Sequence, residues 1–172
     1  MNKMRIALIH ALKHSLVPIE ASFARLWPDA SLMNLLDDSL SADVAREQAP
    51  MPVLKPNEAM IEQAVSKGRK IGLLSTFPPT LVSMPPEFPR GVVVVPKLAE
   101  GALAALDRGD RAEHDRLVAE AARDLRDCDL VALAQYSMAP AAALVAEASG
   151  RPVLTTPDSA VQKLKELLGV GG

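Results

Sequence analysis

The sequence has 172 residues, of which 49% are hydrophobic and 23% are charged, a balance typical of a globular protein with a substantial core. The formal net charge is −2, from 19 basic and 21 acidic side chains, and aromatic residues make up only 3%. This composition argues against electrostatic binding of nucleic acid and against base-stacking surfaces. No apolar stretch approaches the roughly 20 residues that span a bilayer, and the opening residues lack a signal-peptide cleavage site, so no membrane association is predicted.

Seven short apolar runs predict β-strands. They are residues 5–9, 32–36, 52–54, 71–75, 92–95, 130–134 and 152–154. Between them, residues 112–125 and 160–168 carry apolar side chains at helical spacing and predict amphipathic helices. Almost continuously apolar strands that alternate with helices predict an α/β fold with parallel sheets covered on both faces.

Two pairs of segments look like internal repeats. Residues 5–23 align without gaps to residues 70–88 and share five identical residues, and residues 51–61 align to residues 151–161 and share Pro-Val-Leu. The same order at both ends of each half favours duplication over chance similarity of strand–helix units. We therefore predict two pseudo-symmetric halves of flavodoxin-like or Rossmann-like type with a ligand cleft between them. Their bounds are residues 1–68 and 69–172, with residues 151–172 free to pack onto the first half.

The first half is shorter than the second. Ile6 to Val53 spans 47 positions, whereas the equivalent Ile71 to Val153 spans 82, a deficit of 35 residues near Gln48–Met51. Either this passage, about one helix–strand–helix unit, was deleted, or the printed sequence omits it. Its loss would expose strand edges. We expect either a break in the chain there or a second copy of the chain, in a homo-oligomer, that covers the edge.

Several common sites are not predicted. The first glycine is Gly68, so the glycine-rich phosphate cradle of nucleotide-binding strand–helix turns is absent. His10 and His14 have metal-ligand spacing, but no glutamate lies between them and His114 falls on a charged helix face, so no metal site is predicted. The single cysteine, Cys128, rules out an internal disulfide, which favours a reducing cytoplasm. It precedes its strand, and we expect a buried, inert thiol.

The segments that follow the predicted strands hold the candidate site residues, because ligands of parallel sheets bind at the carboxyl ends of strands. These candidates are His10, Asn57, Ser75, Thr76, Gln135, Tyr136, Ser137 and Thr155. Helix capping is a strong alternative for Asn57 and for the Thr155–Asp158 segment. It is a weaker alternative for Gln135–Ser137, which lacks a clear capping pattern.

The chain resembles the aspartate/glutamate/hydantoin racemases, which are related to arylmalonate decarboxylase and maleate isomerase. The similarity rests on the two α/β halves, the opening RIALIHAL, the strand and turn CDLVALAQYSM, and the closing RPVLTTPDSAVQKL. The resemblance implies an isomerase without cofactor that acts on a small carboxylate. In this family two cysteines, one from each half, face opposite sides of the α-carbon; one removes the proton and the other returns one.

At both positions the sequence departs from the family pattern. Alignment of CDLVALAQYSM places Gln135 where the second cysteine would lie, and the first would fall within the missing passage. Two hypotheses follow. The chain is either an isomerase or lyase whose base would come from His10 or from the missing passage, with Gln135 as the other weak catalytic candidate, or a catalytically silent relative that binds a carboxylate or has a structural role.

Overall fold

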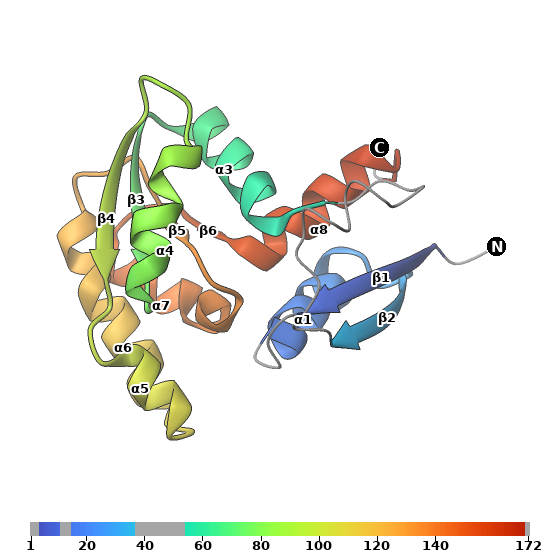
Figure 1. The fold of residues 1–172 in the computed structure, drawn as a ribbon, viewed down its shortest axis with the longest axis horizontal. Helices are drawn as coiled ribbons and strands as arrows, with labels where there is room; N and C mark the ends of the chain where they lie inside the picture. Colours follow the sequence, from blue (N-terminus) through green and yellow to red (C-terminus); the bar gives the residue numbers. More distant parts are fainter. Residues whose placement is uncertain (1–3, 11–14, 37–53, 171–172) are drawn as a thin grey trace.

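The computed structural model describes residues 4–10, 15–36 and 54–170 and shows an α/β fold with two parallel sheets (Figure 1). One sheet pairs β1 (Arg5–His10) with β2 (Ser31–Leu36). The other has the order β4-β3-β5-β6, formed by β3 (Lys70–Ser75), β4 (Val93–Leu98), β5 (Leu130–Leu133) and β6 (Val153–Thr155). All pairings are parallel, as the apolar strand pattern predicts.

Helices and turns connect these strands. The α-helices are α1 (Leu16–Leu26), α3 (Pro56–Lys67), α4 (Pro78–Ser83), α5 (Ala102–Asp107), α6 (Arg111–Ala122), α7 (Ala142–Ser149) and α8 (Thr156–Leu167). Short 3₁₀ turns are η2 (Pro85–Glu87), η3 (Arg123–Leu125) and η4 (Tyr136–Ala141). No helix in the part of the chain described here combines the length and apolar character of a membrane span.

The four-stranded sheet is covered by helices on both faces, and alternate residues of its central strands face opposite layers. Ile71 and Leu73 of β3 pack with α3 and the segment around η2, whereas Leu74 packs with α6 and α7. Gly72 lies on the second face, where a Cβ atom would come within 2.9 Å of the Leu125 side chain. Glycine at this position therefore lets η3 approach the sheet closely.

Strand β4 continues past its predicted end at Val95, through Pro96 to Leu98. The backbone N–H groups of Val93 and Ala99 donate to the carbonyl oxygens of Arg69, just before β3, and Ser75, at its end. The N–H groups of the even-numbered residues between them therefore point to the outer edge of the sheet. Pro96 is one of these residues, and its missing N–H removes no bond to β3. A proline is therefore tolerated here because β4 is an edge strand.

The predicted equivalence of residues 5–23 and 70–88 holds for the strands β1 and β3 but is wrong for the helices that follow. Helix α1 is continuous from Leu16 to Leu26, whereas α4 ends at Ser83 and gives way to a 3₁₀ turn. Pro85 and Pro86 explain the difference, because a proline in a helix interior lacks the N–H donor and clashes with the carbonyl one turn earlier.

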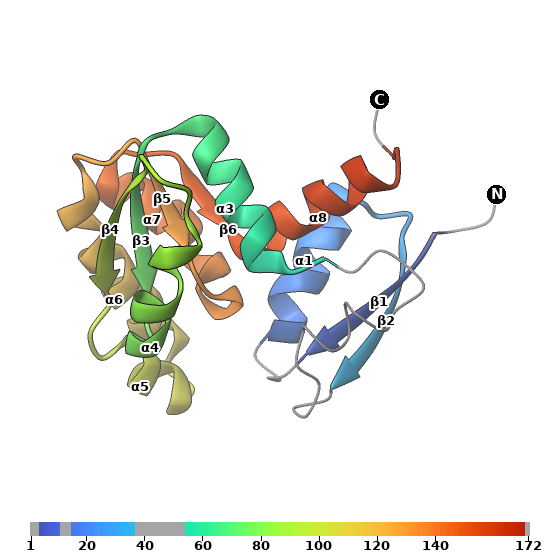
Figure 2. The same ribbon diagram turned by 45° about the horizontal axis from the view of Figure 1, so that its top comes forward.

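Helices α3 and α8 each begin and end at positions that differ by one hundred, 56 and 67 against 156 and 167. The two helices pack against each other (Figure 2). Lys163 Nζ lies 2.8 Å from Glu62 Oε1, and Gln63 Nε2 donates to Gln162 Oε1 at 2.6 Å. Lys163 lies one hundred positions after Gln63, and Gln162 lies one hundred positions after Glu62, so the two contacts join equivalent positions of the two helices. A pseudo-twofold axis between the two helices would produce this reciprocal pattern, and the two duplicated halves stay a prediction.

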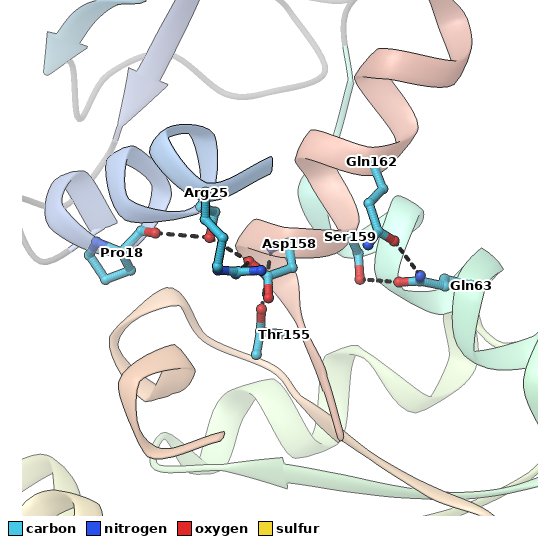
Figure 3. Close-up of polar contacts among 8 residues, drawn as sticks. Pro18, Arg25, Gln63, Thr155, Asp158, Ser159 and Gln162 are labelled. Atoms are coloured by element: carbon cyan, nitrogen blue, oxygen red, sulfur yellow. Dashed lines mark hydrogen bonds and ion pairs between the residues drawn. The ribbon is translucent and has the colours of Figure 1, made fainter. Parts of the chain in front are cut away.

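Polar contacts also tie α8 to α1 (Figure 3). Asp158 Oδ1 accepts hydrogen bonds from Ser22 Oγ at 2.6 Å and from Arg25 Nη2 at 2.5 Å. Next to these contacts, Phe23 of α1 and Trp27, the residue that follows α1, pack against Val161 of α8 in a small apolar cluster. Helix α8 therefore follows the last strand of the four-stranded sheet but buries its apolar side chains against α1.

Some predictions fall outside the described residues. These are the strand at 52–54, apart from Leu54, and the break or covering subunit near Gln48–Met51. Leu54 lies two residues before the start of α3 and is not in a strand. The boundary between residues 68 and 69 and the homo-oligomer stay predictions.

Asp129 fixes the turn that precedes β3. Its Oδ2 atom accepts the backbone N–H groups of Arg69 at 2.7 Å and Lys70 at 2.8 Å, and these bonds hold the pKa of the carboxyl below its ordinary value. A lowered folded-state pKa stabilises the fold at neutral pH and loses that effect as pH falls through the folded-state value.

We therefore expect Asp129→Asn to lower the free energy of unfolding most at pH 6–7, with a difference from wild type that shrinks below about pH 4. Urea denaturation at several pH values measures this difference. A difference that stays constant across the series would contradict the role given to the Asp129 charge.

Candidate functional site

Polar residues at and just beyond the carboxyl ends of β3 and β5 form a hydrogen-bonded group at this edge of the four-stranded sheet, here called the Gln135 cluster (Ser75, Thr76 and Gln135). Gln135 Oε1 accepts hydrogen bonds from Ser75 Oγ at 3.0 Å, the Thr76 backbone N at 2.7 Å and Thr76 Oγ1 at 2.8 Å. Because β3 and β5 are neighbours in the sheet, the segments that follow them lie side by side. Ser75 and Thr76 are buried, and Gln135 is half-buried.

These bonds determine the orientation of the Gln135 carboxamide. The backbone N–H of Thr76 is only a donor, so the atom that faces it must be the amide oxygen. The amide nitrogen, Nε2, is therefore directed away from Ser75 and Thr76, and it makes no hydrogen bond within the described residues. The cluster holds two N–H donors that remain available to a ligand.

Tyr136, the residue after Gln135, lies on the side of this edge that faces α1 and α8. Its half-buried side chain packs against the apolar cluster that α1 and α8 form around Phe23. Burial raises the pKa of the Tyr136 phenol, so the hydroxyl is neutral at physiological pH and can donate a hydrogen bond. Tyr136 therefore carries a neutral hydroxyl group and packs where α1 and α8 meet.

Arg111 is a residue that the sequence analysis missed. It begins α6, and its Nη1 atom lies 3.5 Å from the backbone carbonyl oxygen of Ser137, a long hydrogen bond. The Ser137 side chain is buried. Asp110 caps the helix and starts it at this edge of the sheet, which brings a guanidinium group beside the turn that begins at Gln135. The cap signal at Asp110 could have indicated the helix start, but not the loop that Arg111 reaches.

The other predicted site residues do not join the Gln135 cluster. Thr155 is buried as the N-cap of α8, where its Oγ1 atom accepts the Asp158 backbone N–H at 3.3 Å. Asn57 is exposed in the first turn of α3 and makes no hydrogen bond to a described residue. His10 ends β1, and its side chain lies outside the described part of the chain. The cleft between the halves stays a prediction, since residues 11–14 and 37–53 are not described.

A pocket of about 330 Å³ opens beside the Gln135 cluster. Thr76 lines this pocket and also donates to Gln135 Oε1, whereas Gln135 does not line the pocket and its Nε2 atom is directed away from Thr76. The opposite wall comes from the end of β4 and from α5, and includes Leu98 and Leu103. Sequence reasoning missed this wall because nothing in the α5 pattern indicates which side faces the strand ends.

Two potentially reactive side chains lie away from solvent. Cys128 is 2% exposed, precedes β5 at the opposite end of that strand from Gln135, and has a pKa raised by burial. His114 was predicted on a charged helix face, but it is fully buried, with Val118 and Ala122 on the side of α6 that faces the sheet. Its Nδ1 atom lies 2.6 Å from Asp115 Oδ1, and its Nε2 atom makes no hydrogen bond to any residue that the structure describes.

Three or more His, Cys, Asp or Glu residues do not gather into a metal-binding group anywhere in residues 4–10, 15–36 and 54–170. The polar atoms of the Gln135 cluster are a carboxamide, two hydroxyls and backbone N–H groups. These neutral groups suit hydrogen bonding to an anion rather than coordination of a metal ion.

A family model described as Asp/Glu/Hydantoin racemase matches residues 13–164 of the chain. A glutamate racemase isoform from Bacillus anthracis superimposes with a TM-score of 0.73 at 12% identity, over 98% of this chain and 84% of that one. An allantoin racemase from Pseudomonas fluorescens gives 0.72 at 14% identity, over 98% and 92%. An aspartate racemase homologue from Pyrococcus horikoshii OT3 gives 0.67 at 13% identity, over 98% and 100%. No curated protein matches the sequence significantly.

Proposed function

The chain belongs to the Asp/Glu/hydantoin racemase family, and from this premise we propose that it binds a small carboxylate at the Gln135 cluster without racemising it through a pair of thiols. The observation that carries the proposal is the orientation of Gln135. Three donors hold its amide oxygen, so its two Nε2 protons are left for a ligand oxygen. A substitution that removes these two protons but keeps the amide oxygen's hydrogen bonds tests the proposal.

The surroundings of the cluster favour a carboxylate as the ligand. A carboxylate only accepts hydrogen bonds, and Gln135 Nε2 donates them; the next residue, Tyr136, carries a neutral phenol that can donate as well. The Arg111 guanidinium adds a positive charge beside the same turn. Together these groups resemble the neutral and cationic donors that stabilise oxyanions in proteins.

The same cluster does not support thiol chemistry. The family mechanism needs a group that takes a proton from the α-carbon, whereas the hydroxyls of Ser75 and Thr76 and the carboxamide of Gln135 do not take up protons near neutral pH. The 172 residues hold one cysteine, and Cys128 lies at the amino end of β5. We therefore favour the carboxylate-binding relative over the isomerase or lyase.

Gln135→Glu tests the proposal sharply, because glutamate keeps the oxygen that accepts from Ser75 and Thr76 but replaces the N–H₂ group with a charged oxygen. We expect this variant to lose about tenfold or more in affinity for propionate, since removing donors and adding a like charge both disfavour the complex. Isothermal titration calorimetry or ligand-observed NMR at fixed ionic strength measures the affinity.

Thermal unfolding provides the folding control, and Gln162→Glu, on the exposed contact with Gln63, provides a matched variant outside the cluster. Gln162→Glu should bind propionate as wild type does. If Gln135→Glu, folded as judged by its melting transition, binds propionate with wild-type affinity, the carboxylate does not contact Gln135 and the proposal is wrong.

A further inference from the structure

Three hydrogen-bond donors converge on a single oxygen atom at the carboxyl ends of β3 and β5. The Ser75 hydroxyl, the Thr76 backbone N–H and the Thr76 hydroxyl lie 3.0, 2.7 and 2.8 Å from Gln135 Oε1. An amide oxygen has two lone pairs, so three donors are one more than it has lone pairs to accept them. The arrangement therefore offers more donors than a neutral carboxamide can use well.

These donors are buried and held in place by the backbone. Ser75 is 0% exposed and Thr76 is 4% exposed. Ser75 Oγ also accepts the Phe77 backbone N–H at 3.0 Å, which fixes the turn after β3. Neither Thr76 donor has an acceptor other than Gln135 within the described residues. Without that side chain both donors would be buried and unpaired, which is a costly state for polar groups.

We infer that these donors, here called the Thr76 cradle (Ser75 Oγ, Thr76 N and Thr76 Oγ1), form a site for an oxygen of a small monoanion, and that Gln135 keeps the site closed by filling it with its own amide oxygen. Hydrogen bonds to a charged acceptor are about twice as strong as those to a neutral one, and converging buried donors stabilise an oxyanion. The cradle also lies between β3 and β5, where the connections of the sheet reverse direction and ligands of open α/β sheets bind.

Gln135 acts as a tethered competitor for the cradle. Beyond its Cβ atom the side chain is –CH₂–CO–NH₂, which has the size and shape of acetamide. Attachment to the chain gives its oxygen a high effective concentration, so a dilute free anion does not displace it. This inference goes beyond the proposed function, which uses the Nε2 protons of the same carboxamide and leaves the cradle filled.

Chemical rescue of Gln135→Ala tests the cradle, because alanine removes an acetamide-sized group and leaves the donors in place. Acetate and acetamide match in shape and differ in charge. We expect Gln135→Ala to bind acetate about tenfold or more tightly than acetamide, since only the anion forms charge-assisted hydrogen bonds. In a ¹H–¹⁵N NMR titration with acetate, the Thr76 backbone amide signal of this variant should shift saturably. In wild type it should not move, because Gln135 already accepts that N–H.

Two further variants locate the binding. Gln135→Ala/Thr76→Val replaces one donor hydroxyl with a methyl group of similar size, and should weaken acetate binding about tenfold relative to Gln135→Ala. Gln162→Ala, at an exposed glutamine of α8, is the matched control and should behave as wild type does in the same titration. Thermal unfolding establishes that each variant is folded.

Gln135→Glu provides a measurement that needs neither a free ligand nor an emptied site. Its carboxylate reaches the same three donors through the same tether. A carboxyl that is held as an anion has a lower pKa in the folded than in the unfolded state, and it stabilises the fold above its unfolded-state pKa. We therefore expect the free energy of unfolding of this variant, relative to wild type, to rise between about pH 4 and pH 7. A difference that is flat or falls over this range would show that the cradle does not prefer an anion.

The outcomes separate this inference from the proposed function. If folded Gln135→Ala binds acetate no more tightly than acetamide, or if its Thr76 amide signal does not respond to acetate, the inference is overturned, and propionate binding by wild type still supports the proposed function. If wild type binds no propionate while Gln135→Ala prefers acetate, the proposed function fails and the cradle stands. Support for the inference requires both the preference for acetate and its reduction by Thr76→Val.

Discussion

Incubated with either enantiomer of aspartate or glutamate, the protein is expected to produce no more racemisation than a sample without enzyme. Racemisation by the family mechanism needs two opposed proton-transfer groups. Gln135 supplies none, and the Cys128 thiol is sealed at the opposite end of β5 with a raised pKa. Each well-placed acid or base raises the rate of proton transfer by roughly 10²–10⁴-fold. A chain without two opposed proton-transfer groups is therefore expected to show almost no racemisation.

Circular dichroism follows loss of optical activity, and deuterium exchange at the α-carbon, measured by proton NMR in D₂O, detects proton transfer even without inversion. Cys128→Ala is the control for any residual thiol chemistry and should match wild type. Turnover clearly above the blank that persists in Cys128→Ala would show that other residues supply the bases. The isomerase or lyase hypothesis would then replace the silent one.

The largest expected loss of stability comes from Phe23→Ala. Phe23 is 2% exposed, its ring lies 6.2 Å from that of Trp27 between centroids, and it packs beside Val161 of α8. Removing a buried aromatic ring loses its transfer free energy and leaves a cavity, so we expect the free energy of unfolding to fall by about 3–5 kcal/mol. The effect should be large because this small cluster joins α1 to α8.

Urea denaturation followed by far-UV circular dichroism measures the loss, and Val17→Ala is the matched control on the same helix. Val17 is 74% exposed, so its truncation should change stability by roughly 0.5 kcal/mol or less. Equal unfolding midpoints for Phe23→Ala and Val17→Ala would mean that the contact between α1 and α8 contributes little to the fold.

The central strands could be predicted because each of them is buried on both faces. Ile71–Leu74 and Leu130–Leu133 are apolar without interruption, a pattern that edge position and proline do not disturb. Strand β4 was underestimated, because only its edge position makes Pro96 acceptable. The equivalence of residues 5–23 and 70–88 was extended too far, because the identities at Leu81, Val82 and Phe88 span the prolines that end α4.

The site could be predicted only where adjacent strands determine it. Ser75, Thr76 and Gln135 follow neighbouring parallel strands, so topology alone brings them to one edge. The positions of Arg111 and of the pocket residue Leu103 depend on how α6 and α5 pack against that edge. No local pattern in the sequence specifies this packing. His114 was misplaced for the same reason, since charged neighbours surround it in the sequence although its own side chain faces the sheet.

The most direct test of a carboxylate at Gln135 is a ¹H–¹⁵N NMR titration that follows the side-chain amide signals of Gln135. Comparison with Gln135→Glu, in which these signals are absent, assigns them. As propionate is added to the wild-type protein, the Gln135 amide pair should shift saturably, because its protons gain a carboxylate acceptor. A saturable shift of other signals with the Gln135 pair unmoved would place the ligand elsewhere and contradict the account.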